Sequence, residues 1–185
     1  MKIKYDQPKT IFNSYKSVLG QRPLWDWRHG KFYWIDVHEK ILIENDSLFE
    51  KEKQFILPEG ITNILLKDTN SFLITSHDTI VEYNLLTNKK LLLKKIIKLN
   101  ETNRINDGAI DLEGNLWIAT MNKLQTTSTG EILQYSRELN EINTDKSYII
   151  SNGPIFDYER KKAYVTDSIK RIIYQFSMNE KNGIK

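Results

Sequence analysis

The stretch KKAYVTDSIKRIIYQFS, residues 161–177, alternates apolar and polar side chains on both sides of a short polar break. Such alternation is typical of two β-strands joined as a hairpin. Three earlier stretches repeat the pattern: GKFYWIDVHEKILIEN (residues 30–45), NSFLITSHDTIVEYN (residues 70–84) and GNLWIATMNKLQTTSTGEILQYS (residues 114–136). The sequence therefore predicts four related hairpins.

The hairpins recur at a near-regular interval. Alignment on Tyr33, Leu73, Trp117 and Tyr164 gives steps of 40, 44 and 47 residues. A further strand-like stretch precedes each hairpin, so that one repeat holds at least three antiparallel strands with room for a fourth. Repeats of this size are typical of β-propeller blades, whereas a β-sandwich would need the spacing to be coincidental. We predict an all-β fold with about four propeller blades, in a single domain over residues 1–185.

Composition limits the class of protein. Of the 185 residues, 39% are hydrophobic, and 27 basic against 24 acidic residues leave a net charge of only +3, which implies no nucleic-acid partner. The absence of cysteine excludes disulfides, thiolate metal sites and cysteine nucleophiles. Neither a signal peptide nor an apolar run long enough to span a membrane is visible, so we predict a cytoplasmic protein with no membrane partner.

The basic stretch NKKLLLKKIIKLN, residues 88–100, allows two interpretations. It could be an amphipathic segment that binds a membrane surface. It could equally be the outer strand of a blade, whose lysines discourage edge-to-edge pairing. Because the stretch is short and carries no Trp or Phe, we favour the edge strand.

Polar residues precede the first strand of each repeat, which in a propeller lines the central channel. If Leu24, Ile64, Ile110 and Ile155 are equivalent, the residues three positions earlier are Gln21, Ile61, Asp107 and Asn152. Arg104 and Asn106 lie just before Asp107. Three of four blades would then offer polar groups at one level, which suits a small molecule or a cation. The alternative is that Asn and Gly occur here only because they favour turns.

Three motifs resemble one known family. They are LGQRPLWD (residues 19–26), NRINDGAIDLEGNLWIATM (residues 103–121) and ISNGPIFDYERKKAYVTDSIKRIIYQF (residues 150–176). In content, order and separation they resemble the SMP-30/gluconolactonase/regucalcin-like (LRE) family, most weakly over residues 40–100. The resemblance implies a six-bladed β-propeller, so that two further blades are expected after Lys185 and the chain reads as C-terminally truncated.

The resemblance also implies a chemistry. Members of the family are mostly lactonases that depend on a divalent metal, held by a Glu, an Asn and an Asp. Gln21 stands at the Glu position, Asn152 at the Asn position, and the Asp, which is also the expected catalytic base, would follow Lys185. Arg104 and Asn106 would hold the substrate, a sugar lactone. Oxygen donors suit calcium first, with zinc, manganese and magnesium as alternatives.

Two positions depart from the family pattern. Gln21 brings an amide oxygen but no charge where the family has Glu, and Arg22 stands where a small residue is usual. Both changes lower the expected affinity for a cation. The alternative to a lactonase is therefore a non-catalytic propeller remnant that binds a small anion, such as a sugar acid, or a protein partner, including another chain that completes the propeller.

Overall fold

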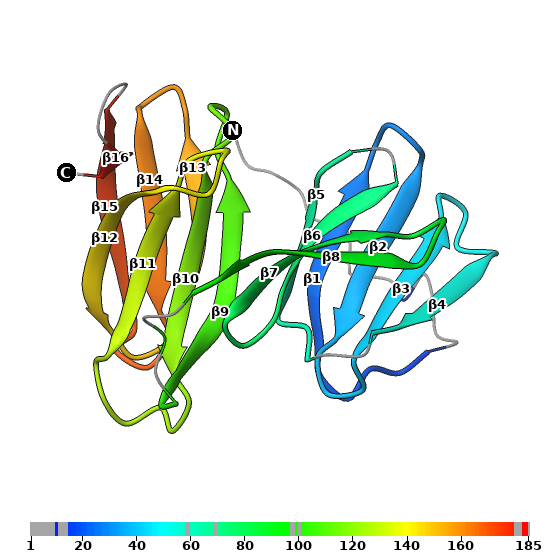
Figure 1. Ribbon diagram of the computed structural model, residues 1–185, viewed down its shortest axis with the longest axis horizontal. Coiled ribbons are helices and arrows are strands. Elements are labelled where there is room, and N and C mark those ends of the chain that lie inside the picture. The colour runs from blue at the N-terminus through cyan, green and yellow to red at the C-terminus, as the bar shows by residue number, and fades with distance from the viewer. Residues whose placement is uncertain are drawn as a thin grey trace. The chain divides into compact units, whose positions relative to one another are not determined.

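The structure is a computed structural model that describes residues 10, 15–57, 60–68, 70–96, 99, 101–179 and 183–184. Within these residues every regular element is a β-strand (Figure 1). The strands form four antiparallel sheets of four, and each sheet consists of four consecutive strands in chain order. This is the arrangement of propeller blades, so the predicted all-β fold class with about four blades is confirmed.

The chain divides into two compact units, Met1–Leu57 and Pro58–Lys185. The first unit holds blade 1, and the second unit holds blades 2, 3 and 4. Blade 1 consists of β1 (Gly20–Asp26), β2 (Lys31–Asp36), β3 (Ile41–Asp46) and β4 (Glu52–Ile56).

The three blades of the second unit follow the same plan. Blade 2 consists of β5 (Asn63–Leu66), β6 (Ser71–Thr75), β7 (Thr79–Asn84) and β8 (Lys89–Lys95). Blade 3 consists of β9 (Asn103–Ile110), β10 (Leu116–Asn122), β11 (Gly130–Tyr135) and β12 (Glu141–Tyr148). Blade 4 consists of β13 (Ser151–Asp157), β14 (Lys162–Asp167), β15 (Ile172–Asn179) and β16 (Gly183–Ile184). None of the described residues forms a helix that could cross a membrane.

The strand register confirms the alignment of the hairpins. Tyr33, Leu73, Trp117 and Tyr164 each pair with a residue of the third strand that is Glu or Gln, namely Glu44, Glu82, Gln134 and Gln175. On the first strands they pair with Leu24, Leu65, Ala109 and Ile155. The predicted equivalents Ile64 and Ile110 are therefore wrong by one residue, in opposite directions.

β-Bulges explain this error. In β1 and β13 the register shifts between Gln21 and Leu24 and between Asn152 and Ile155, so that each strand holds an extra residue. β5 has no such shift, and in β9 the shift comes earlier, between the partners of Thr120 and Ala119. A bulge changes how many residues separate two equivalent positions. The equivalent polar position consequently lies three residues before the aligned residue in blades 1 and 4 but two residues before it in blades 2 and 3. In blade 3 the count from Ile110 still reaches Asp107, because the two errors cancel.

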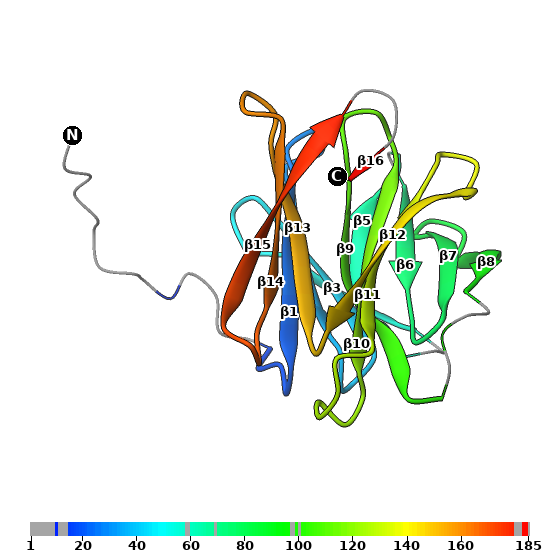
Figure 2. The same cartoon turned by 90° about the vertical axis from the view of Figure 1, so that its left-hand side faces the viewer.

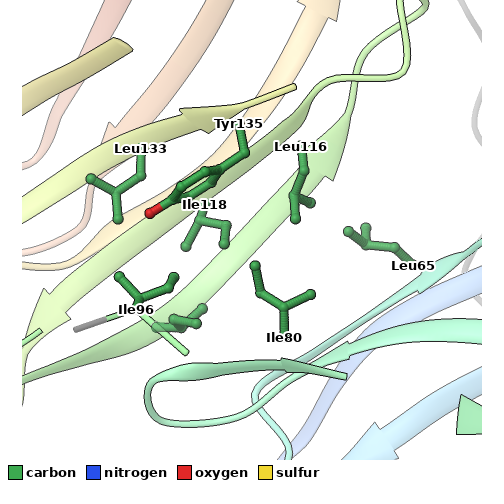
Figure 3. Close-up of a cluster of buried hydrophobic side chains, with 8 residues drawn as sticks. Leu65, Ile80, Ile96, Leu116, Ile118, Leu133 and Tyr135 are labelled. Atoms are coloured by element: carbon green, nitrogen blue, oxygen red, sulfur yellow. The ribbon is translucent and has the colours of Figure 1, made fainter. Parts of the chain in front are cut away.

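The core of the second unit lies between its blades. Leu65, Ile80 and Ile96 of the blade 2 region pack against Leu116, Ile118, Leu133 and Tyr135 of blade 3, with Ile105 completing the cluster (Figure 3). A second cluster joins Trp117 and Tyr148 of blade 3 to Val165 and Phe176 of blade 4. Each blade is thus apolar on the faces that meet its neighbours, which is how stacked sheets bury their side chains.

The first strands of these three blades lie side by side. β9 contacts both β5 and β13, and the three strands occupy neighbouring positions in Figure 2. Residues at the same level of these strands are therefore brought together, although they are about forty-five residues apart in the chain, as the bond from Asn63 to Gly108 illustrates. This arrangement positions the candidate site.

The lysine-rich stretch after residue 88 supplies the outer strand of blade 2, as predicted. β8 pairs only with β7 and ends the sheet order of its blade. Leu91 and Leu92 are more than half exposed, between lysines that are themselves solvent-exposed or half-buried. Residues 97, 98 and 100 of the same stretch lie outside the described residues.

Candidate functional site

A polar residue occupies one equivalent position of the first strand in every blade. This position pairs with Ile35, Thr75, Ala119 and Thr166 of the second strands, and the residues that occupy it are Gln21, Asn63, Asp107 and Asn152. Blade 2 thus contributes Asn63 at this position. The sequence had predicted Ile61, which is wrong. Ile61 is 1% exposed and belongs to the core.

Asn106 joins blade 3 to blade 4. It lies at the bulge of β9, between the residues that pair with Thr120 and Ala119. Its Nδ2 atom donates hydrogen bonds to the carbonyl oxygen of Ser151 at 3.0 Å and to Oδ1 of Asn152 at 3.1 Å. The structure therefore brings together two of the residues predicted for the site. It also commits both protons of the Asn106 amide, so that a substrate could meet only the oxygen of this side chain.

The orientation of the Asn152 amide follows from these bonds. A carbonyl oxygen can only accept, so the atom of Asn106 that meets Ser151 must be the amide nitrogen. That nitrogen requires an acceptor on Asn152, which places Oδ1 of Asn152 toward Asn106. The opposite atom, Nδ2 of Asn152, then donates to Oγ of Ser168 at 2.9 Å. Asn152 is held in one orientation from both sides.

Asp107 fixes the backbone next to Asn152. Its Oδ2 atom accepts a hydrogen bond from the Gly153 N–H at 2.8 Å, and its Oδ1 atom accepts one from the Gly108 N–H at 2.8 Å. Gly153 has a φ of +99°, a conformation that favours glycine. The sequence pointed to Asp107 as a polar residue but gave no sign of this bond, because the bulge in β13 that presents the Gly153 N–H is not visible in a sequence.

Asn63 occupies the corresponding position of blade 2. Its Nδ2 atom donates to the Gly108 carbonyl oxygen at 3.1 Å, while its buried Oδ1 atom has no partner among the atoms that the structure describes. A Cβ atom on Gly108 would lie 2.5 Å from the Trp117 carbonyl oxygen and 3.3 Å from Nδ2 of Asn63. Only glycine therefore allows the strands to approach closely enough for this bond.

Arg104 lies on β9, two residues before Asn106, and is half-buried. Its Nη1 atom donates to the Ile105 carbonyl oxygen at 2.9 Å. Burial lowers the pKa of the Arg104 guanidinium, but arginine starts so high that the group stays charged at neutral pH. No carboxylate of the described residues forms an ion pair with it, so its charge is available to an anionic or strongly polar ligand.

Gln21 belongs to the other compact unit, which holds blade 1. It pairs with Ile35 at the start of the β1 bulge. Arg22 follows in the left-handed region, with a φ of +58°. The predicted site residues thus divide into Arg104, Asn106 and Asn152, which share the second unit, and Gln21, which does not.

The donor atoms of the second unit suit a hard cation. Oδ1 of Asn152 is an oriented amide oxygen of the kind that calcium, magnesium and manganese accept. No group of three or more His, Asp or Glu side chains able to hold a metal ion occurs in the part of the chain that the structure describes. Asn152 fits the role of one oxygen ligand, and further ligands would have to come from outside its immediate surroundings.

Comparison with known proteins agrees with the pattern of motifs. A family model described as the SMP-30/Gluconolactonase/LRE-like region matches residues 19–185. The chain belongs to the SMP-30/gluconolactonase/LRE-like family. Membership covers all four blades and accounts for the three motifs around Gln21, Asn106 and Asn152.

Individual relatives have low sequence identity to this chain, but the similarity extends over most of its length. A 6-deoxy-6-sulfogluconolactonase of Pseudomonas putida is 25% identical over 164 residues, which cover 89% of this chain and 56% of the relative. Regucalcin of Agrobacterium tumefaciens, a calcium-binding protein of known structure, superposes with a TM-score of 0.82 at 22% identity, over 92% of this chain and 58% of the other. A luciferin-regenerating enzyme gives a TM-score of 0.83 at 21% identity, over 92% and 59%. The chain spans less than two thirds of the length of these relatives.

Proposed function

We propose that this chain belongs to a sugar lactone hydrolase that depends on a divalent cation, and that Asn152 is one ligand of that cation. Family membership supports the lactonase class, since a relative is named as a sulfogluconolactonase. The observation that carries the proposal is the double anchoring of the Asn152 amide by Asn106 and Ser168, which presents an oxygen atom in a fixed direction. Calcium is the first candidate, because one structural relative is a calcium-binding regucalcin.

The roles of the residues follow from their atoms. Asn152 would hold the cation through Oδ1. A bound cation supplies polarisation of the lactone carbonyl and a lower pKa for a water molecule. Water then adds to the carbonyl carbon, the ring C–O bond breaks and a hydroxy acid is released. Arg104 would bind substrate oxygens through its forked N–H groups, and Asn106 would accept a hydrogen bond from a substrate hydroxyl.

The test is hydrolysis of glucono-1,5-lactone with calcium, manganese, zinc or magnesium added to metal-free protein. We expect cation-stimulated turnover that rises in Gln21→Glu, which restores the carboxylate that the family resemblance implies at this position, and that disappears in Asn152→Ala. Gln175→Glu, an exposed position on β15, is the matched control and should leave turnover unchanged. Absence of cation-stimulated hydrolysis in both the wild type and Gln21→Glu would refute the proposal.

A second candidate function is the binding of a sugar acid without catalysis. It is favoured by the Arg104 guanidinium, which has no carboxylate partner among the described side chains. Gluconate should then raise the melting temperature of the wild type but not that of Arg104→Met, while divalent cations have no effect. Stabilisation by cations without any effect of gluconate would count against this candidate and for the lactonase.

A further inference from the structure

We infer that Ser168 is a positioning residue, which holds the Asn152 side chain in the orientation that Asn106 selects, with Oδ1 as the oxygen offered to a ligand. The inference rests on the proposed function in so far as the ligand is a cation. The family resemblance implies roles for Gln21, Arg104, Asn106 and Asn152 but none for Ser168. Its assignment comes from the bond between Nδ2 of Asn152 and Oγ of Ser168, at 2.9 Å.

An amide side chain needs such a partner because its two ends are similar in size and opposite in chemistry. If Asn152 turned by 180° about its last torsion, an N–H group would replace the oxygen ligand and would repel a cation. Asn106 opposes this turn from one side, since its Nδ2 atom requires an acceptor. The Ser168 hydroxyl can donate as well as accept, so it does not select between the two orientations. By accepting from Nδ2 of Asn152 it holds the amide in the orientation that Asn106 selects.

Ser168 itself is held by a rigid turn. Its backbone N–H donates to the Ile150 carbonyl oxygen at 3.0 Å. The adjacent Asp167, which is fully buried, accepts from the Ile169 and Lys170 N–H groups at 3.2 Å each. The Ser168 side chain is exposed, but its backbone is fixed on both sides. An exposed hydroxyl on such a turn can position Asn152 without being part of the core.

Blade 1 shows what the same turn looks like without the hydroxyl. The equivalent of Ser168 is Val37, whose N–H donates to the Leu19 carbonyl oxygen at 3.1 Å. Valine offers no acceptor to Gln21, the equivalent of Asn152. The turn therefore forms with either side chain, and the hydroxyl of Ser168 is not required for its backbone. This separates a positioning role from a purely structural one.

The experiment uses the whole 185-residue chain and four proteins: wild type, Ser168→Ala, Ser168→Thr and Ser177→Ala. Ser177→Ala is the matched control, because Ser177 also accepts a side-chain hydrogen bond in blade 4, from Nζ of Lys162 at 2.9 Å. Two quantities are measured: the NMR signals of the Asn152 side-chain amide, assigned by their loss in Asn152→Asp, and the apparent affinity for calcium and manganese from titration.

We expect Ser168→Ala to shift the Asn152 amide signals and to weaken cation binding about tenfold, the usual effect of losing a residue that orients a metal ligand. Ser168→Thr, which keeps the hydroxyl, should restore both quantities, and Ser177→Ala should change neither. Unchanged amide signals in Ser168→Ala would overturn the inference whatever the cation does. A wild type that binds no cation while the amide signals shift as expected would instead refute the proposed function and the ligand part of the inference.

Discussion

Blades 1 and 4 are built on the same backbone plan but carry different side chains at the candidate site. Each has a first strand whose second residue is polar, followed by a bulge that contains a proline and then by an apolar pair: Gln21-Arg22-Pro23 in one, Asn152-Gly153-Pro154 in the other. Each also has a buried aspartate at the end of its second strand, Asp36 in blade 1 and Asp167 in blade 4.

The difference between the two blades lies in what holds the polar residue. Asn152 is bonded by Asn106 and Ser168. Gln21 has Val37 at the place of Ser168, and its side chain makes no hydrogen bond with the described residues of its blade. The shared backbone thus depends on the aspartate and the bulge, whereas ligand chemistry depends on a few side chains added to it. Substitutions at equivalent positions of the two blades test each part of this contrast.

The largest effect is expected from the buried aspartates. Asp167 accepts from the backbone N–H groups of Ile149, Ile150, Ile169 and Lys170, so Asp167→Ala leaves several donors without an acceptor. We expect a loss of about 3 kcal/mol in the free energy of unfolding. The measurement is segment-resolved hydrogen exchange, with faster exchange across blade 4.

Asp36→Ala is the counterpart in blade 1, since Asp36 accepts from the N–H groups of Val18, Leu19, His38 and Glu39. It should give a loss of similar size that is confined to residues 15–57. Glu159→Ala, an exposed acidic residue of blade 4, is the control and should change the free energy by less than about 0.5 kcal/mol. Equal losses for Glu159→Ala and Asp167→Ala would disprove the role given to the aspartates.

The two bulges should respond unequally to substitution. Gly153 has a φ of +99°, and an added Cβ would lie 3.2 Å from the Tyr164 carbonyl oxygen, so Gly153→Ala should cost about 2 kcal/mol. Arg22 has a φ of +58° and already tolerates a side chain, so Arg22→Gly should change stability by less than about 1 kcal/mol. Urea unfolding measures both. A loss in Arg22→Gly as large as that in Gly153→Ala would contradict this prediction and would show that the Arg22 side chain stabilises blade 1.

Asn45 marks a third difference, inside the sheets. It is fully buried in β3 and both polar atoms of its side chain lack partners among the described residues, whereas the equivalent residues of blades 2, 3 and 4 are Tyr83, Tyr135 and Phe176. Replacing it by leucine removes two unsatisfied groups, and we expect a gain of about 1–2 kcal/mol. Asn45→Asp should destabilise the protein instead. A loss of stability in Asn45→Leu, seen as a lower urea midpoint, would contradict this account.

The fold could be predicted from sequence because many residues contribute to the pattern that indicates it. Alternation of apolar and polar residues predicts at least three strands in each of the four repeats, and the period predicts the blades, so that an error at one position has little effect. The alignment at Tyr33, Leu73, Trp117 and Tyr164 was confirmed by the register. The division into units before Pro58 has no comparable sequence signal.

The site could be predicted only in part. Asn106 and Asn152 were found from their places just before the first strands and from the family resemblance, and the structure joins them. Asn63 was missed because a bulge in other blades altered the residue count, and Ser168 was missed because its bond to Asn152 crosses from one strand to the end of the next. Such contacts depend on local backbone geometry, which composition and period do not determine.

The smallest effect concerns acid stability, for which Asp26 and Asp157 occupy equivalent places at the ends of β1 and β13. The bond from the Arg28 side chain, aided by His29, lowers the pKa of Asp26 to about 2, and the bond from Arg160 lowers that of Asp157. A carboxyl group whose pKa is lowered by folding stabilises the protein above its unfolded pKa near 4. This contribution is lost as the pH falls through the folded value.

Arg28→Gln should therefore reduce the free energy of unfolding above pH 4 and converge with the wild type toward pH 2. The slope of the free energy of unfolding with pH between these limits should fall by at most about 1.4 kcal/mol per pH unit, the limit set by one titrating group. Urea unfolding followed through Trp25, Trp27 and Trp34 reports on blade 1. Arg160→Gln, followed by hydrogen exchange in blade 4, should reduce the free energy of unfolding less, because Asp157 is half-buried whereas Asp26 is 1% exposed. A constant difference between Arg28→Gln and wild type at all pH values would show that Arg28 stabilises the turn by packing and not through Asp26.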